Sequence, residues 1–185
     1  MTETINPANN WALVEKRLGE ESDPVLIRNL ETVLKHMKAE AMLDLDGLLA
    51  TVHPDARYHF FGSEDDEAFA GPKGKENVEE FYRSIIAMDI HRIEHDIDRL
   101  VVDQHCVITE GEMKIAYPGK LLGEMGYPVD DPEAYYLYQT RSLIVWPMSD
   151  DGRVLGEDSY TGKDGFAGIE TRKLAPDAIA TVKAG

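Results

Sequence analysis

The clearest helical pattern lies between Asp23 and Leu43, where apolar residues recur every three or four positions. Asp23 can cap the first turn of this helix, and Pro24 suits its first position. An amphipathic pattern also covers 76–88. Shorter helices are predicted over 10–21, with Asn10 as the cap, and over 43–53, where Pro54 ends the helix. The apolar stripe of the long helix contains Leu26, Leu30, Val33, Leu34, Met37 and Ala41.

Strands are predicted where apolar and polar residues alternate, which places alternate side chains on opposite faces of a sheet. These segments are 56–62, 92–103, 105–117, 135–148 and 153–161, and the Asp151-Gly152 step predicts a hairpin between the last two. A polar loop is predicted over 62–74. The connection 118–134 is long enough to form a lid over the pocket, or it is a long loop without a function.

Helices followed by long strands in hairpins predict an α+β fold, a conical roll in which a curved, mainly antiparallel sheet wraps over three or four helices. The concave side of such a sheet encloses an internal pocket, where small ligands bind. In the strand at 105–117, every second residue from Val107 to Tyr117 lies on one face, which is predicted to point inward. In the strand at 93–103, Ile93, His95, Ile97, Arg99 and Val101 share one face, so a histidine stands on an apolar surface.

Length and charge limit the classes of function. The 185 residues predict one core domain over 23–162, with an N-terminal helical extension (1–22) and a C-terminal tail (163–185). A net charge of −16 argues against nucleic acid and anionic membrane as partners. No apolar run suits a bilayer, and no secretion signal opens the chain. The single cysteine, Cys106, fits a cytoplasmic location.

Two segments in order, "DLDGLLATVHPDARYHFFG" and "AGPKGKENVEEFYRSI", resemble the SnoaL-like branch of the nuclear-transport-factor-2-like superfamily. The likeness continues through "EHDIDRLVVDQHCVITEGEM" and the hairpin "SLIVWPMSDDGRVLGEDSYTG", and covers roughly 25–162. The resemblance implies the conical fold, a pocket inside it and a homodimer formed through the sheet. Relatives include ketosteroid isomerases, dehydratases, a dehydrochlorinase, polyketide cyclases, epoxide hydrolases and non-catalytic proteins, so it implies no single reaction.

His95 matches the position of the base in the dehydratase branch. An imidazole near neutrality can take a proton from carbon, and an apolar wall would keep it neutral. The alternative is a core histidine satisfied by a backbone carbonyl. The branch pairs its base with a helix aspartate whose position falls on Ala41, which leaves Glu40 or Asp44 as the partner. Asp44 can instead cap the next helix.

A late-strand carboxylate serves as acid or base in cyclase- and hydrolase-like relatives. Asp158 is the candidate here, although another register favours Glu157, and either can instead face solvent. Tyr58 and Phe60 match pocket-lining aromatic residues, and Tyr58 can donate to an oxyanion or simply fill the core. Arg141 can clamp an anionic group or lie on the surface. Phe81, Met113 and Trp146 are predicted to line the pocket or the core.

These residues predict a cofactor-independent acid/base enzyme acting on a small hydrophobic molecule. A dehydratase-like lyase ranks first, with His95, Glu40, Asp158 and Tyr58 as catalytic residues, and an isomerase or cyclase ranks next. The positions that match the epoxide hydrolase arginine and aspartate are Gly111 and Met113, which argues against that chemistry. No metal site is predicted, because His91 and His95 would lie some 13 Å apart on a strand. The alternatives are a non-catalytic ligand-binding or dimeric interaction module and, more weakly, a hydrolase using Asp158.

Overall fold

The structure, a computed structural model, describes residues 5–61 and 70–181. Three helices come first: α1 (Asn9–Glu20), α2 (Pro24–Ala41) and α3 (Leu45–Thr51). Strands β1 (Arg57–Phe61) and β2 (Ala70–Lys73) and helix α4 (Lys75–Ala87) follow. The rest comprises β3 (Ile93–Val102), β4 (Cys106–Pro118), α5 (Gly119–Glu124), β5 (Tyr135–Pro147), β6 (Asp158–Thr161) and a 3-10 turn (Ile169–Thr171).

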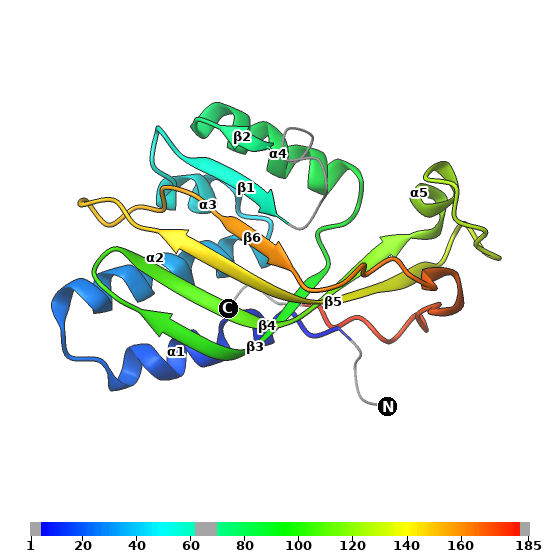
Figure 1. The fold of residues 1–185 in the computed structure, drawn as a ribbon. Helices are drawn as coiled ribbons and strands as arrows, with labels where there is room; N and C mark the ends of the chain where they lie inside the picture. The colour runs from blue at the N-terminus through cyan, green and yellow to red at the C-terminus, as the bar shows by residue number, and fades with distance from the viewer. Residues whose placement is uncertain (1–4, 62–69, 182–185) are drawn as a thin grey trace.

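The six strands form one curved sheet in the order β2-β1-β6-β5-β4-β3 (Figure 1). All neighbouring pairs are antiparallel except β1 and β6, which run parallel. The sheet is therefore mixed and remains open, and helices α1 and α2 run along one face of it (Figure 1). This arrangement confirms the predicted α+β fold.

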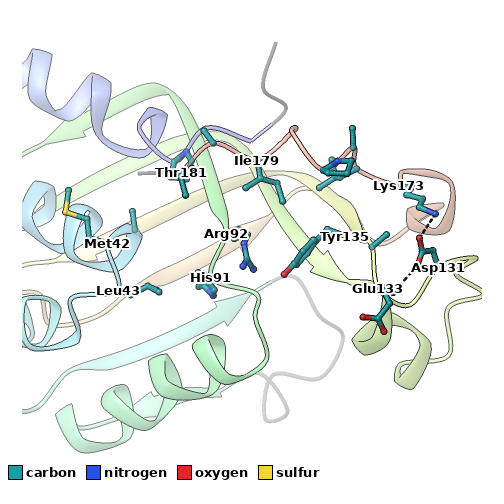
Figure 2. Close-up of a pocket in the computed structure, with 17 residues that line it drawn as sticks. Met42, Leu43, His91, Arg92, Asp131, Glu133, Tyr135, Lys173, Ile179 and Thr181 are labelled. Atoms are coloured by element: carbon teal, nitrogen blue, oxygen red, sulfur yellow. Dashed lines mark hydrogen bonds and ion pairs between the residues drawn. The ribbon is translucent and has the colours of Figure 1, made fainter. Parts of the chain in front are cut away.

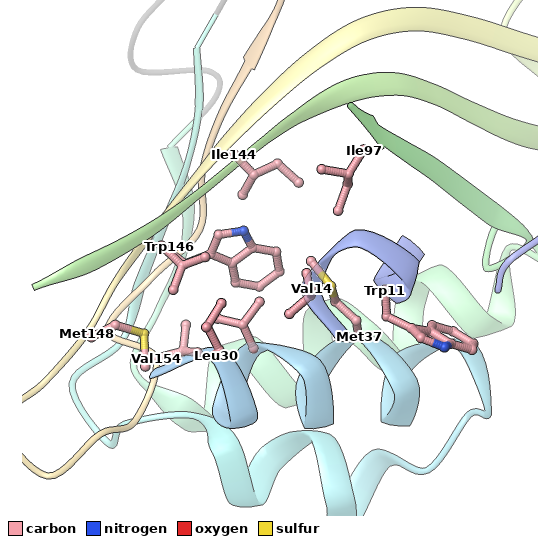
Figure 3. Packing of buried hydrophobic residues seen from close by; sticks show 11 residues of the cluster. Trp11, Val14, Leu30, Met37, Ile97, Ile144, Trp146, Met148 and Val154 are labelled. Carbon is pink, nitrogen blue, oxygen red and sulfur yellow. The ribbon is translucent and has the colours of Figure 1, made fainter. Parts of the chain in front are cut away.

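The main core lies between that face of the sheet and helices α1 and α2 (Figure 3). Trp146 and Ile144 point from β5 toward α2, and Ile97 points from β3 toward α1 (Figure 3). Trp11 and Val14 of α1 belong to the same cluster. The N-terminal helix thus contributes to the core and covers the edge of the sheet.

The two predicted helix caps have different outcomes. Asp23 caps α2, because its Oδ1 accepts hydrogen bonds from the backbone N–H groups of Val25 (2.8 Å) and Leu26 (3.3 Å). The prediction that Asn10 caps α1 is wrong, since α1 begins one residue earlier. Asn10 Oδ1 instead accepts from the backbone N–H of His95 at 2.6 Å, so the amide fastens the helix to β3.

The predicted faces of β3 hold only for its first half. Ile97 is buried as predicted, but the pairing with β4 shifts register between Ile97 and Arg99. This bulge sends Arg99 and Val101 to the outer, exposed side, so their predicted place beside His95 is wrong. Gly111 lies opposite the bulge, where a Cβ atom would come within 2.1 Å of the Asp96 carbonyl oxygen.

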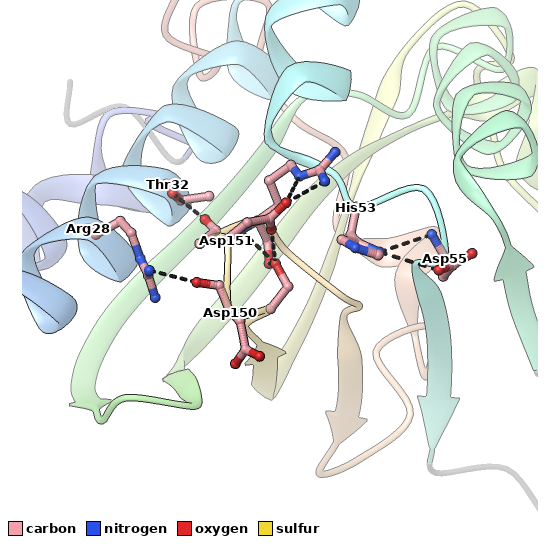
Figure 4. Close-up of polar contacts among 9 residues, drawn as sticks. Arg28, Thr32, His53, Asp55, Asp150 and Asp151 are labelled. Atoms are coloured by element: carbon pink, nitrogen blue, oxygen red, sulfur yellow. Dashed lines mark hydrogen bonds and ion pairs between the residues drawn. The ribbon is translucent and has the colours of Figure 1, made fainter.

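The last hairpin is confirmed, although its second strand is shorter than predicted. Strand β6 begins at Asp158, and Val154 forms only isolated bridges with Val52 and Met148. The turn is tied to α2, because Arg28 Nη1 donates to the Asp150 carbonyl (2.9 Å) and Thr32 Oγ1 to the Gly152 carbonyl (2.8 Å) (Figure 4). Residues 153–157 therefore form a connection whose side chains do not follow a strand's alternation.

The predicted loops and tail contain more structure than expected. Part of the predicted polar loop, 62–69, lies outside the described residues, but 70–73 forms β2 against β1. Helix α5 lies within the long connection at 118–134, where Leu122 packs in a second cluster with Tyr136 and Ile169. The C-terminal tail packs on its own chain, since Ile179 bridges Ile5. Among the described residues, no helix has the length and apolarity to span a bilayer.

The core predicts a contrast between two valines on α2. Val33 is 0% exposed and Val25 is 37% exposed. Val33→Ala should lower the free energy of unfolding by about 2 kcal/mol, because two buried carbon atoms are lost and a cavity is left. Val25→Ala should change it by less than about 0.5 kcal/mol. Urea unfolding with an unchanged m-value measures both, and equal losses would contradict the assignment of this core.

Candidate functional site

A cavity of about 390 Å³ lies between the sheet and helices α2 and α4, within the range of small-ligand sites. Apolar and aromatic side chains make up most of its wall, and none of the described lining residues is a lysine or arginine. The lining residues with polar atoms in their side chains are Asn10, Glu40, Tyr82, Ser84, His95, Tyr117, Tyr138, Thr140, Ser142, Glu157, Ser159 and Thr161. The hollow predicted inside the sheet is present.

His95 lines this cavity from β3 and is 3% exposed. Its Nε2 lies 3.3 Å from the Ser142 carbonyl oxygen, which can only accept a hydrogen bond. This contact assigns the ring proton to Nε2 and leaves the lone pair on Nδ1. Burial lowers the pKa of His95 from 6.5 to about 4, so the imidazole is neutral at physiological pH. The sequence analysis gave a place in the cavity and a backbone carbonyl partner as alternatives, and His95 has both.

Glu40 lines the same cavity from α2. Burial, with the nearby charge of Glu157, raises the pKa of Glu40 from 4.5 to about 7, and His36 opposes this rise. Within residues 5–61 and 70–181, no hydrogen bond reaches the Glu40 carboxyl, and the imidazole of His95 bonds to Ser142 instead. The two groups thus share a cavity without forming a hydrogen-bonded dyad.

The late-strand carboxylate in the cavity is Glu157, whereas Asp158 points to the outer face of the sheet. Asp158 accepts a hydrogen bond from His59 Nδ1 at 2.6 Å there. Glu157 accepts one from the Tyr82 hydroxyl at 2.8 Å, and His36 Nε2 lies 3.2 Å from the same oxygen. Of the two registers that the sequence left open, the structure has the one that turns Glu157 inward.

His36 is a buried polar residue that the sequence analysis did not single out. A signal was present, because Asn29, His36 and Glu40 lie seven and four residues apart, which places them on one side of the helix. This row runs beside the apolar stripe of α2, and Asn29 and His36 within it are fully buried. Polar residues on a buried helical face need partners, so this row indicates buried polar contacts on that side of α2.

The other predicted site residues lie in four places. Phe60, Phe81, Met113 and Trp146 line the cavity. Tyr58 is buried behind it, edge-on to Phe81 and Tyr82, and burial raises the pKa of its phenol well above 10. Asp44 caps α3 by accepting from the Gly47 N–H at 2.9 Å. Arg141 is exposed and pairs with Asp98 and Glu110 on the outer face.

A larger groove of about 680 Å³ lies elsewhere, between the end of α2, the start of β3 and the C-terminal tail (Figure 2). Its lysine and arginine side chains are paired: Lys173 Nζ lies 2.9 Å from Asp131 Oδ2, and Arg92 pairs with Asp89 beside the groove. Arg92 also lies over the ring of Tyr135. Because these groups satisfy each other, the cavity that contains His95 and Glu40 is the better candidate site.

Several solved structures share this fold. A candidate SnoaL-like polyketide cyclase from Shewanella putrefaciens CN-32 matches with a TM-score of 0.64 and 13% identity over 92% of this chain and 97% of that one. One from Jannaschia sp. CCS1 matches with a TM-score of 0.58 and 20% identity over 84% and 98%. An epoxide hydrolase of the LEH-like type from M. tuberculosis matches with 0.60 and 19% over 80% and 94%.

Comparison with functionally curated proteins finds no match. The family model described as the SnoaL-like domain matches residues 33–154, which include the C-terminal half of α2, the sheet strands β1 to β5 and both His95 and Glu40. Since this match covers more than half of the chain, the protein belongs to the SnoaL-like domain family.

Proposed function

We propose that the protein is a cofactor-independent acid/base enzyme that acts on a small hydrophobic molecule. A dehydratase-like elimination is the first choice, and isomerisation or cyclisation comes next. The observation that carries the proposal is that a neutral imidazole and a protonatable carboxyl line one apolar cavity. Groups whose environments push their pKa values in opposite directions are typical of acid/base pairs.

In the elimination, His95 is the base and Glu40 the acid. The Nδ1 lone pair of His95 takes a proton from a carbon atom, and the C–H electron pair becomes the new double bond. The leaving hydroxyl departs as water with the proton of Glu40. The product and water then leave, and solvent returns the proton from the imidazolium to the carboxylate.

A non-catalytic ligand-binding module is the second candidate. Two observations favour it: no carboxylate of the described residues hydrogen-bonds to His95, and an imidazole with a pKa of about 4 is a weak base. The elimination requires the bound substrate to raise the pKa of His95, for example by drawing the Glu40 carboxyl toward the imidazole. Turnover therefore separates the two candidates.

The proposal includes a homodimer formed through the outer face of the sheet. In support, the rings of Phe61 and Tyr160 stack there at 4.5 Å while remaining 38% and 44% exposed. The net charge of −16 and the single cysteine support a cytoplasmic protein without nucleic-acid or membrane partners.

The protonation states predict a bell-shaped pH dependence of kcat/KM. His95 is neutral above about pH 4 and Glu40 is protonated below about pH 7, so activity should rise through the first value and fall through the second. A substrate is first found by a thermal-shift screen of steroids, polyketides and phenolic alcohols, since a bound ligand raises the melting temperature. Activity that climbs steadily above pH 8 would contradict the role of Glu40.

Substitution of the base gives the second test. His95→Asn should lower kcat by about 10² to 10⁴-fold while the Kd for the ligand changes little, because proton transfer is lost and the wall remains. His105→Asn is the matched control, since His105 is exposed in the β3–β4 turn. Stopped-flow or steady-state turnover and calorimetric binding measure the two quantities. Full activity of His95→Asn would show that His95 is not the base of the elimination.

The raised pKa of Glu40 also predicts an effect on stability that needs no substrate. A folded-state pKa of about 7 against 4.5 means that the native state binds the extra proton, so stability falls as pH rises between these values. Glu40→Gln removes this loss and should be more stable than the wild type at pH 8, by no more than about 3 kcal/mol.

At pH 4, where Glu40 and a glutamine are both neutral, the two proteins should be nearly equal in stability. Glu31→Gln, an exposed site on the same helix, is the control and should show no such dependence. Urea-unfolding curves of the three proteins are measured in parallel from pH 4 to pH 8. If no difference in stability develops between them, the carboxyl at position 40 has an ordinary pKa.

A further inference from the structure

His36 lies behind the cavity wall, and its hydrogen-bond partners indicate which of its ring nitrogens carry a hydrogen. The side chain is 0% exposed and does not line the cavity. The rings of Tyr82 and Trp146 meet it edge-on at 5.9 and 5.4 Å. Three polar groups reach it: Thr51 from α3, Tyr82 from α4 and Glu157 from the segment before β6.

The Thr51 contact fixes one ring proton. The Thr51 hydroxyl has a single hydrogen, which it donates to the Leu48 carbonyl oxygen at 2.6 Å. Thr51 Oγ1 must therefore accept from His36 Nδ1, which lies 2.7 Å away. Nδ1 carries a hydrogen, and a neutral His36 would present a bare lone pair at Nε2.

The other ring nitrogen faces two oxygens. Nε2 lies 3.0 Å from the Tyr82 hydroxyl and 3.2 Å from Glu157 Oε1. The Tyr82 hydroxyl lies 2.8 Å from the same Glu157 oxygen and has only one hydrogen, which it donates there. With His36 neutral and Glu157 ionised, a nitrogen lone pair would meet a carboxylate oxygen without a hydrogen between them. One further proton satisfies the arrangement.

We propose that His36 and Glu157 share this proton, and that Glu157 exchanges it with a ligand in the cavity. Glu157 is then a third catalytic residue, and His36 and Tyr82 are positioning residues that act through it. This inference rests on the proposed function, since it adds a proton-exchanging group to the same cavity. It also gives the buried His36 on α2 a function that packing alone does not require.

The transfer balances without any other reactant. When Glu157 acts as acid, its O–H bond breaks, a ligand oxygen gains the proton, and the Tyr82 hydroxyl continues to donate to the carboxylate. The carboxylate then faces the bare Nε2 of His36, and this repulsion favours recovery of a proton from solvent. When Glu157 acts as base, the shared proton resides on Nε2 and the carboxylate oxygen accepts one from the ligand.

The residue after Glu157 belongs to a second histidine–carboxylate pair, which provides a matched comparison. Asp158 and His59 form a second histidine–carboxylate pair at 2.6 Å on the outer face, where their side chains are 27% and 31% exposed. Water can solvate both members of that pair, so proton sharing is not required to satisfy them. His59→Gln therefore controls for the loss of a histidine–carboxylate contact outside the cavity.

The test is nuclear magnetic resonance of the full chain, with ¹⁵N-labelled histidine and ¹³C-labelled glutamate. At neutral pH, either His36 should carry hydrogens on both ring nitrogens or Glu157 should carry the proton, because the contacts of Nε2 require one. Glu157→Gln should convert His36 to the neutral form with its hydrogen on Nδ1 alone, and His59→Gln should leave it unchanged. An ionised Glu157 beside an unprotonated Nε2 at the same pH would overturn the proposal.

Turnover supplies a second readout. Glu157→Gln should lower kcat about 100-fold with little change in KM, because the cavity keeps its shape and loses an exchangeable proton. His36→Gln should shift the pH dependence of kcat, which a purely structural role would not do. If that variant fails to fold, Thr51→Val replaces it, since it removes only the partner of Nδ1 and should shift the same profile. Unshifted profiles in the folded variants would contradict the relay.

The two hypotheses fail separately. Full activity of the His95 and Glu40 variants, together with a shared proton at His36, would reject the elimination and keep the pair. Activity that depends on His95 and Glu40, together with an unshared proton, would reject the pair and keep the elimination.

Discussion

The packing of α2 against the concave face of the sheet is the contact on which the core and the cavity both depend. One stripe of α2 carries Leu30, Val33 and Met37 into the main cluster. The row beside it carries His36 and Glu40 toward the cavity and its back wall. Because Trp146 belongs to the core cluster, lines the cavity and meets His36 edge-on, the same packing that stabilises the fold fixes the polar groups.

Most of the fold was predictable because periodicity reports burial directly. The stripe of α2, the inward face of β4 and the last hairpin all follow from alternation or helical spacing. Prediction failed where the backbone departs from a regular element. The bulge after Ile97 reversed the faces of β3, and its only local signal was Gly111 on the neighbouring strand, where the close approach of Asp96 leaves no room for a side chain.

The site was predictable to the extent that its residues lie on regular elements. His95 lies before the bulge and faces the cavity as expected, and Glu40 follows from helical geometry. The choice between Glu157 and Asp158 was not predictable, since β6 begins only at Asp158 and the residues before it form a connection. The partners of His36 come from α3, α4 and the segment before β6, so no local pattern could reveal them.

The cavity differs from a salt-bridged site in how its charges are balanced. No described lining residue is a lysine or arginine, while the Arg and Lys side chains of β4 and β5 pair with carboxylates on the outer face. Inside, desolvation and the nearby Glu157 raise the pKa of Glu40 by more than His36 lowers it, and desolvation lowers the pKa of His95. Protons, instead of ion pairs, therefore set the charge of this cavity. Protons are also the species that an elimination moves. A described lining without lysine or arginine suits neutral hydrophobic ligands. It disfavours anionic ligands, which would meet a carboxylate without a counter-charge.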